Sequence, residues 1–226
     1  MLQEITIINL SLPFKMGNVN CYLIKTSSGF VLIDAGSSNQ QTEIERELDS
    51  AGCQPGALNL IVLTHGDFDH SGNAAYLHEK FGAKIAMHLE DRVMVEQGDM
   101  FGKRQKANNI ITRKLVPIFF EFGKSHRFKP DIYLDEGDDL SEHGLEAEVL
   151  GLPGHSKGSI GILTAAGDLF CGDLLENTKQ PGLNSLMDDP VAAKTSVEKI
   201  KELEIYTVYP GHGEPFAMDQ FIKNNP

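Results

Sequence analysis

The feature that most constrains this chain is an aliphatic run that ends abruptly in a cluster of imidazoles and carboxylates. Residues 58–63 contain no Gly or Pro and predict a buried strand, and the next residues are Thr64-His65-Gly66-Asp67-Phe68-Asp69-His70. Such polar crowding at the edge of an apolar core is costly, whereas a bound metal ion makes it favourable. This stretch alone is also compatible with a solvated turn that caps a helix near Ser71, so the rest of the chain must decide.

Composition limits the classes of protein that this chain can belong to. The 226 residues contain no Ser/Gly/Pro-rich linker, which predicts a single domain over residues 1–226. A net charge of −12 argues against a nucleic-acid-binding surface.

There is no basic start followed by an apolar run and no segment of 18 apolar residues, so we expect no membrane span and a cytoplasmic location. Cys21, Cys53 and Cys171 are widely spaced and predict neither disulfides nor a thiolate zinc site.

The hydrophobic pattern alternates between strands and helices and repeats in the two halves of the chain. We expect strands at 4–10, 18–25, 29–33, 58–63, 84–88, 132–134, 145–150, 159–164, 168–170 and 207–209. We expect helices from 38 to about 51, from about 71 to 81, at 89–97 and at 190–203, and a helical stub from about 215. This duplication predicts an α/β fold of two similar halves packed sheet to sheet, with helices outside.

Four apolar runs each end in a residue type that binds metals. They are Leu63-Thr64-His65, Leu152-Pro153-Gly154-His155, Phe170-Cys171-Gly172-Asp173 and Tyr209-Pro210-Gly211-His212. Because sites in α/β sheets gather beyond the carboxyl ends of strands, we expect these endings to converge. The candidate ligands are His65, Asp67, Asp69, His70, His155, Asp173 and His212. Seven ligands are too many for one tetrahedral zinc ion but suit two ions that share a carboxylate.

In this order the motifs resemble those of the metallo-β-lactamase superfamily, whose pattern is Thr-His-x-His-x-Asp-His, then Gly-His, Gly-Asp and Gly-His. The match runs from His65 to His212. The resemblance implies a four-layer αββα sandwich with two metal ions at one edge. It implies that one ion is held by His65, Asp67 and His155 and the other by Asp69, His70 and His212, with Asp173 as the bridge. Asp34 matches an acid that supports the site from behind, although a plain turn residue is the alternative.

The sequence departs from this pattern at Asp67, where the family has His. A carboxylate shifts the first site toward harder ions, so zinc is expected but iron or manganese must be considered. Position 67 also resembles the flavodiiron branch, which has Glu there. A diiron oxidoreductase that needs a separate electron donor is therefore one alternative function, and a non-catalytic metal-binding protein is another.

The function implied by the resemblance is hydrolysis by a hydroxide that bridges the two metal ions. It would cleave an ester, thioester, lactone or phosphoester bond of a small molecule, with Asp69 and Asp173 as the catalytic carboxylates that orient the water. A true β-lactamase is disfavoured because its common branches have Cys where Asp173 stands. The glyoxalase II resemblance is weakened by the absent second His and by the lack of that enzyme's helical substrate domain.

A basic, aromatic insert at about 99–130 is the best clue to the substrate. It carries eight Lys or Arg residues against two acids, so its net charge is +6 in a chain of net charge −12. We interpret it as a lid that attracts an anionic substrate. A dimer contact and a membrane-facing patch are the alternatives. His88 ends a strand and is a further candidate for lining the pocket.

Overall fold

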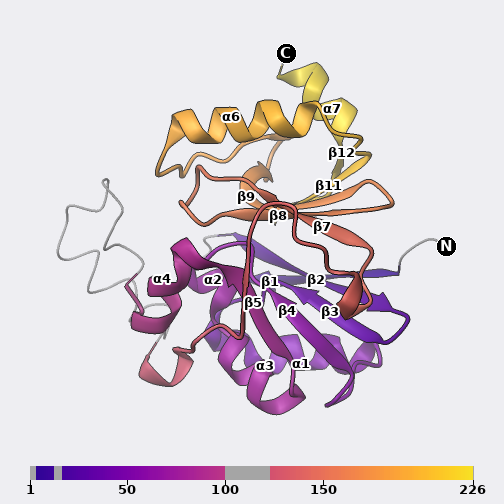
Figure 1. The fold of residues 1–226 in the computed structure, drawn as a ribbon, viewed down its shortest axis with the longest axis vertical. Coiled ribbons are helices and arrows are strands. Elements are labelled where there is room, and N and C mark those ends of the chain that lie inside the picture. The colour runs from indigo at the N-terminus through magenta and orange to yellow at the C-terminus, as the bar shows by residue number, and fades with distance from the viewer. Residues whose placement is uncertain (1–3, 13–16, 100–122, 226) are drawn as a thin grey trace.

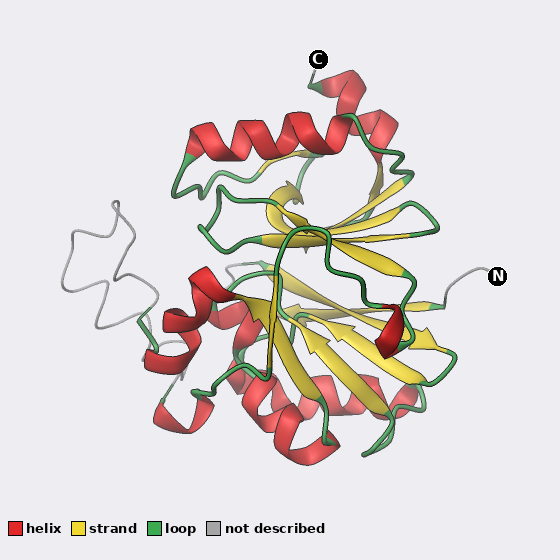
Figure 2. Ribbon diagram, viewed as in Figure 1, coloured by secondary structure: helices red, strands yellow, loops and turns green. Residues whose placement is uncertain are grey.

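Two six-stranded sheets lie face to face, and helices cover the outer face of each sheet (Figures 1 and 2). The computed structural model describes residues 4–12, 17–99 and 123–225. Most of the predicted insert, including residues 100–122, lies outside the described residues. Helices α1 (Gln41–Ser50) and α3 (Ala74–Phe81) cover the first sheet, and α6 (Pro190–Lys201) and α7 (Met218–Asn224) cover the second. The predicted four-layer αββα sandwich is therefore confirmed.

The first sheet brings the ends of several strands to one edge. Its strands follow the chain order: β1 (Ile5–Ser11), β2 (Asn18–Thr26), β3 (Gly29–Ile33), β4 (Leu58–Val62), β5 (Lys84–His88) and β6 (Ile132–Leu134). The first three are antiparallel, whereas β3 to β6 are parallel to one another. Helix α1 is the crossover between β3 and β4, as the alternation of strand, helix and strand predicts. The carboxyl ends of β3, β4 and β5 consequently share one edge.

The second sheet has the order β12-β11-β9-β8-β7, with β10 paired to β9. Its strands are β7 (Ala147–Gly151), β8 (Ile160–Thr164), β9 (Asp168–Asn177), β10 (Gly182–Leu183), β11 (Thr207–Gly213) and β12 (Phe216–Ala217). Two strands are longer than expected, because the parallel pairing of β9 with β11 continues through shifts of register on either side of Pro210. The strand β12 also precedes α7, where a helical stub was expected from about 215.

The short helices of the described residues lie in the connections that join successive strands. They are α2 (Phe68–Ser71), α4 (Arg92–Gln97), and the 3-10 turns η2 (Ser38–Gln40), η3 (Leu89–Asp91), η4 (Lys124–His126) and η5 (Ser141–His143). The single helix expected from about 71 to 81 is in fact two, because α2 begins three residues earlier and α3 starts only at Ala74. Because α2 starts at Phe68, Asp69 and His70 of the polar cluster lie on a helix, whereas His65 and Asp67 precede it.

Three apolar cores hold the layers together, one between the sheets and one beneath the helices of each outer layer. Ile44 and Leu48 of α1 are fully buried in the first outer core, as their spacing predicts. Cys171 lies in the outer core under α6, and all three cysteines are buried and free. A thiol at this position belongs to the packing of the second sheet, which agrees with the interpretation from sequence.

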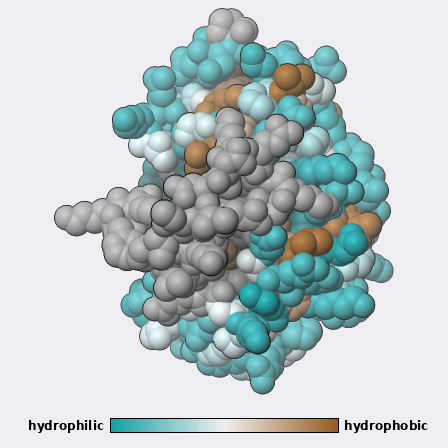
Figure 3. Space-filling view, turned by 90° about the vertical axis from the view of Figure 1, so that its left-hand side faces the viewer, coloured by the Kyte–Doolittle hydropathy of each residue, from teal (hydrophilic) through white to brown (hydrophobic). Residues whose placement is uncertain are grey.

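Hydrophilic side chains predominate among the described residues on the face of the molecule that Figure 3 shows. On the face shown in Figure 3, the apolar patches of the described residues are small and separated by hydrophilic side chains. Among the residues that the structure describes, none of the helices has the length and apolar character needed to cross a membrane.

Candidate metal centre

The polar cluster after β4 changes backbone conformation in its middle, and this change aims its side chains at two places. His65 follows the strand, and Asp67 has an extended backbone with φ −67° and ψ 151°. Helix α2 starts at the next residue, so Asp69 and His70 project from a helical turn. The two pairs of side chains therefore leave the backbone in different directions.

The second sheet supplies the other three candidate ligands. His155 lies in the connection between β7 and β8. Asp173 and His212 were expected just beyond strand ends, but they lie within β9 and β11. The expectation was wrong because the irregular pairing at Pro210 carries both strands into the site. The neighbouring Gly211 has no room for a side chain, since a Cβ there would meet Asp173 Oδ1 and His70 Cε1.

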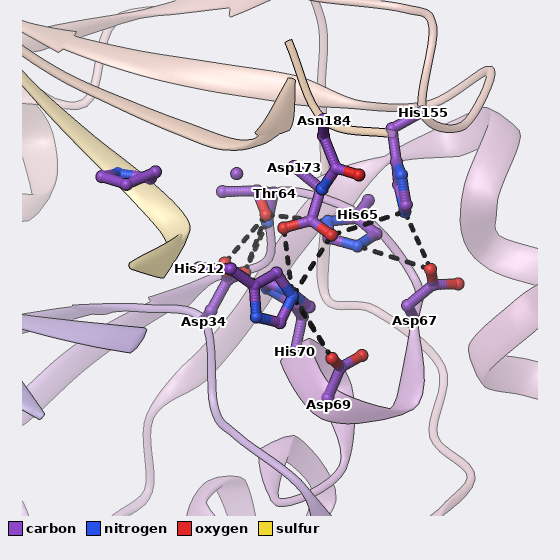
Figure 4. A network of polar contacts seen from close by, with 12 residues as sticks. Asp34, Thr64, His65, Asp67, Asp69, His70, His155, Asp173, Asn184 and His212 are labelled. Atoms are coloured by element: carbon purple, nitrogen blue, oxygen red, sulfur yellow. Dashed lines mark hydrogen bonds and ion pairs between the residues drawn. The ribbon is translucent and has the colours of Figure 1, made fainter. Parts of the chain in front are cut away.

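The structure brings all seven predicted side chains together in three overlapping groups (Figure 4). In each group the candidate ligand atoms lie within 4.8 Å of one another. The first group is His65, Asp67 and His155, the second is Asp69, His70 and His212, and the third joins His65 and His70 to Asp173. The first two groups have the same members as the two ligand sets that the resemblance implies. Each of them contains residues from both sheets.

Asp173 lies between the first and second groups. Its Oδ1 is 3.3 Å from His70 Nε2, and its Oδ2 is 3.8 Å from His155 Nε2 and 3.4 Å from His212 Nε2. In Figure 4 His155 and Asp67 lie to the right of its carboxylate and His212 lies below it. One buried carboxylate therefore faces both groups.

Each of the four imidazoles is fixed by a hydrogen bond at Nδ1, on the side away from the site. The acceptors are Thr64 Oγ1 for His65 at 3.0 Å, Asp34 Oδ2 for His70 at 2.8 Å, Leu186 O for His155 at 2.6 Å and Asn18 O for His212 at 2.7 Å. Carbonyl and carboxylate oxygens can only accept, and the Thr64 hydroxyl already donates to Asp34, so Nδ1 carries a proton in all four rings and Nε2 faces the site. A metal ion bound at Nε2 needs this arrangement and would displace any proton held there.

Asp34 supports both imidazoles that come from the first sheet. Its carboxylate accepts from the backbone N–H of Thr64 at 2.8 Å and from the Thr64 hydroxyl, which in turn accepts from His65. It also accepts from His70 Nδ1. Asp34 has a φ of +59°, a strained conformation for a residue with a side chain, and these hydrogen bonds offset the strain. The plain-turn alternative for Asp34 is therefore wrong.

The charges of the site are strongly coupled. Burial alone would raise the pKa of Asp173, but His212 and His70 outweigh it and hold that pKa well below its usual range. Burial lowers the pKa of His65 well below its usual value, and His70 lowers it further. Burial would also lower the pKa of His212, but Asp173 outweighs it and raises that pKa to about 9. Without a metal ion, the raised pKa values of His70 and His212 favour protons on these imidazoles, which offset part of the negative charge of the surrounding carboxylates.

The side chains fit a metal centre. His65 Nε2, His70 Nε2 and Asp173 Oδ1 are buried and, within the described part of the chain, make no well-aligned hydrogen bond, although the last two lie 3.3 Å apart as an ion pair. Buried polar atoms without partners are rare and costly, and here three of them converge on one spot. Imidazole nitrogens and carboxylate oxygens are suitable ligands for divalent ions such as zinc, iron or manganese.

Several contributors to the site have no signal in the sequence. The carbonyls of Leu186 and Asn18 hold His155 and His212, and every residue has such a carbonyl. Asn184 accepts from the backbone N–H of Leu186 at 2.8 Å and so orders the turn that holds His155. His88 does not join any ligand group among the described residues. Its Nδ1 accepts instead from the backbone N–H of Glu90.

Comparison with known proteins identifies relatives over most of the chain. The family model described as Metallo-beta-lactamase superfamily matches residues 15–212. The "Probable metallo-hydrolase YqjP" of Bacillus subtilis is 27% identical, over 97% of this chain and 75% of that protein. The "Acyl-coenzyme A thioesterase MBLAC2" of Gallus gallus is 25% identical, over 93% of this chain and 78% of that protein.

Another relative and a solved structure are also similar over most of the chain. The "Hydroxyacylglutathione hydrolase GloC" of Haemophilus influenzae is 30% identical, over 73% of this chain and 70% of that protein. The solved structure of TTHA1623, described as a di-iron-bound form, is 26% identical with a TM-score of 0.70. The similarity covers 96% of this chain and 98% of that one.

Proposed function

The chain belongs to the metallo-beta-lactamase superfamily, and from that premise we propose that it is a hydrolase that uses two divalent metal ions to cleave the thioester bond of a small anionic substrate. The observation that carries the proposal is the carboxylate of Asp173, which faces two ligand groups at once. A single metal site would leave one of these groups without a role.

The residues assigned to the metals are those that the resemblance implies. His65, Asp67 and His155 hold the first ion, and the second group, Asp69, His70 and His212, holds the other. When bound, the ions act as Lewis acids and lower the pKa of bound water to roughly 7. Zinc suits both groups, while the Asp67 carboxylate makes the first group receptive to iron or manganese. The di-iron form of TTHA1623 supports iron as an occupant of this fold.

Two carboxylates of the chain handle the water and its proton. Asp173 is the more buried and orients the attacking water between the two groups, with its side chain 6% exposed. Asp69 is 20% exposed, and burial raises the pKa of its carboxyl, which makes it a better proton acceptor. We assign to Asp69 Oδ2 the proton of the attacking water. That proton passes to the sulfur as the carbon–sulfur bond breaks, and the products are a carboxylic acid and a thiol.

The choice of a thioester is supported by two relatives. MBLAC2 is named as an acyl-coenzyme A thioesterase, and GloC as a hydrolase of hydroxyacylglutathione, which is also a thioester. Coenzyme A and glutathione are anionic at neutral pH. The basic insert at about 99–130, with a net charge of +6 in the sequence, suits such a substrate.

The test is a substrate panel on protein of known metal content. An acyl thioester, the matched oxygen ester, a lactone and a phosphodiester are compared by kcat/KM, with thiol release measured directly. We expect the thioester to be preferred, and removal of metal by a chelator to abolish the activity. Preference for the phosphodiester would overturn the substrate class. Oxygen reduction that depends on an electron donor, in protein containing iron, would instead identify the oxidoreductase alternative.

A further inference from the structure

Asp91 is a buried carboxylate that the proposed reaction does not use. It ends the turn η3 and is 2% exposed. Its Oδ2 accepts from the backbone N–H of Gly66 at 3.1 Å and from the Ser156 hydroxyl at 2.6 Å, and its Oδ1 accepts from the backbone N–H of Gly158 at 2.9 Å. Both oxygens of this buried acid are therefore satisfied, and all three partners are donors.

The partners of Asp91 belong to the two loops that carry the first ligand group. Gly66 lies between His65 and Asp67 in the loop after β4. Ser156 follows His155 in the loop after β7. One carboxylate thus ties a loop of the first sheet to a loop of the second. Hydrogen bonds to a charged acceptor are among the strongest in proteins, so the distance between these loops is firmly set.

The loop after β7 is built to receive this carboxylate. A Cβ at Gly158 would lie 2.6 Å from Asp91 Oδ1, closer than atoms can approach. A residue with any side chain at this position would push the loop away from Asp91 and would move His155 with it. The glycine in His155-Ser156-Lys157-Gly158 is thus required by Asp91 and not by the backbone conformation alone.

Asp34 and Asp91 are two buried acids that differ in the ligand groups they support. Asp34 binds His70, a member of the second group, through a direct hydrogen bond. Among the described residues, the side-chain hydrogen bonds of Asp91 go only to the loops of the first group. We infer that Asp91 is a positioning residue that sets the separation of His65 and Asp67 from His155, and thereby the metal affinity of the first group but not of the second. This inference rests on the proposed metal centre.

The test follows each group separately by nuclear magnetic resonance. Metal-free protein with 15N-labelled histidine is titrated with zinc, and the Nε2 signals of His65 and His155 are compared with those of His70 and His212. Asp91→Asn keeps the volume but places a donor where an acceptor is needed. We expect zinc affinity at His65 and His155 to fall about tenfold or more, with the other two signals unchanged.

Matched variants separate positioning from general damage. Asp131→Asn changes a carboxylate that accepts from the backbone N–H of Ile85 at 2.8 Å, at the opposite end of β5, and it should leave both groups unchanged. Gly158→Ala should weaken the same group as Asp91→Asn. Ser156→Ala removes one of the three hydrogen bonds and should have a smaller effect of the same kind, which keeps the test valid if Asp91→Asn does not fold.

Two results would overturn the inference. One is that Asp91→Asn binds zinc at all four histidines with the affinity of the wild-type protein. The other is that the zinc affinity of both groups falls by the same factor. If the wild-type protein itself binds no zinc at His65 and His155, the proposed metal centre fails instead. The two failures are thus distinguishable in one experiment.

Discussion

At position 67 a carboxylate stands 2.9 Å from His155 Nε2, where the family pattern has an imidazole. Imidazole prefers borderline ions such as zinc, whereas a carboxylate adds negative charge and oxygen character. Asp67→His should therefore raise the ratio of zinc to iron and manganese by about an order of magnitude. It should also move the lower limb of the pH–rate profile to lower pH. The neutral imidazole cancels less of the positive field of the metal ions, so the water bound to them becomes more acidic. Metal analysis after growth with equal zinc, iron and manganese measures the first effect.

A matched control places an imidazole on the surface. Glu198→His lies on α6, where the Glu198 side chain is 70% exposed, and it should not alter the metal ratio. If Asp67→His leaves both the metal ratio and the profile unchanged, Asp67 does not bind the metal.

Asp173 and Cys171 are two residues apart on β9, yet they face opposite sides of the second sheet. Asp173→Ala should lose one or both metal ions, because two cations would then repel each other without a shared carboxylate. Cys171→Ala should keep its metal and lose only about 1–2 kcal/mol of stability, through a small cavity under α6. Metal stoichiometry after dialysis distinguishes them. Full occupancy by two ions in Asp173→Ala would rule out the bridge.

At the scale of the element, the extension of β11 into the site depends on Gly211. Gly211→Ala would press a methyl group against Asp173 and His70, so we expect about tenfold weaker zinc binding and a loss of roughly 1–3 kcal/mol in stability. Gly182→Ala in β10 is the control, because the nearest atom to its added Cβ is 3.9 Å away. Chelator competition measures the affinities, and equal values for the two variants would contradict the close approach.

The elements also show what the sequence could and could not predict. The seven candidate ligands could be predicted because four apolar runs each lead into metal-binding residue types, and the other three candidates lie in the polar cluster that follows the first run. The limits of β9 and β11 could not be found, because the shifted register is set by the partner strand. The role of Asp91 could not be found either. Its partners include two backbone N–H groups, which any residue type could supply.

For the whole molecule, the metal-free protein should lose stability as the pH rises. The pKa of His212 is about 9 in the folded state, against about 6.5 when unfolded, and the pKa of His70 is also raised. A raised pKa means that the folded state holds its proton more tightly. The part of this stabilisation that comes from His212 is complete below about pH 6.5 and is lost as the pH rises through about 9. Urea unfolding of chelator-treated protein across this range should show a falling free energy of unfolding.

The metal-loaded protein provides the contrast. Metal ions replace the protons on these imidazoles. The fall in the free energy of unfolding between pH 6.5 and about 9 should therefore disappear when metal is bound. Loading should also raise stability in proportion to the logarithm of the free metal concentration. A decline of the same size in both forms would show that His70 and His212 do not exchange protons for metal.

The placement of the ligands on both sheets also determines when the centre can form during synthesis. The first group needs His155 in addition to His65, and the second needs His212, which lies 147 positions after His65. At about 5–20 residues per second, roughly three to eleven seconds separate the emergence of His155 from that of His212. A nascent chain that contains only the first sheet can complete neither group. Metal uptake by the second group would consequently be a late step in biosynthesis, whereas the first group could be completed while strands β8 to β12 are still to be made.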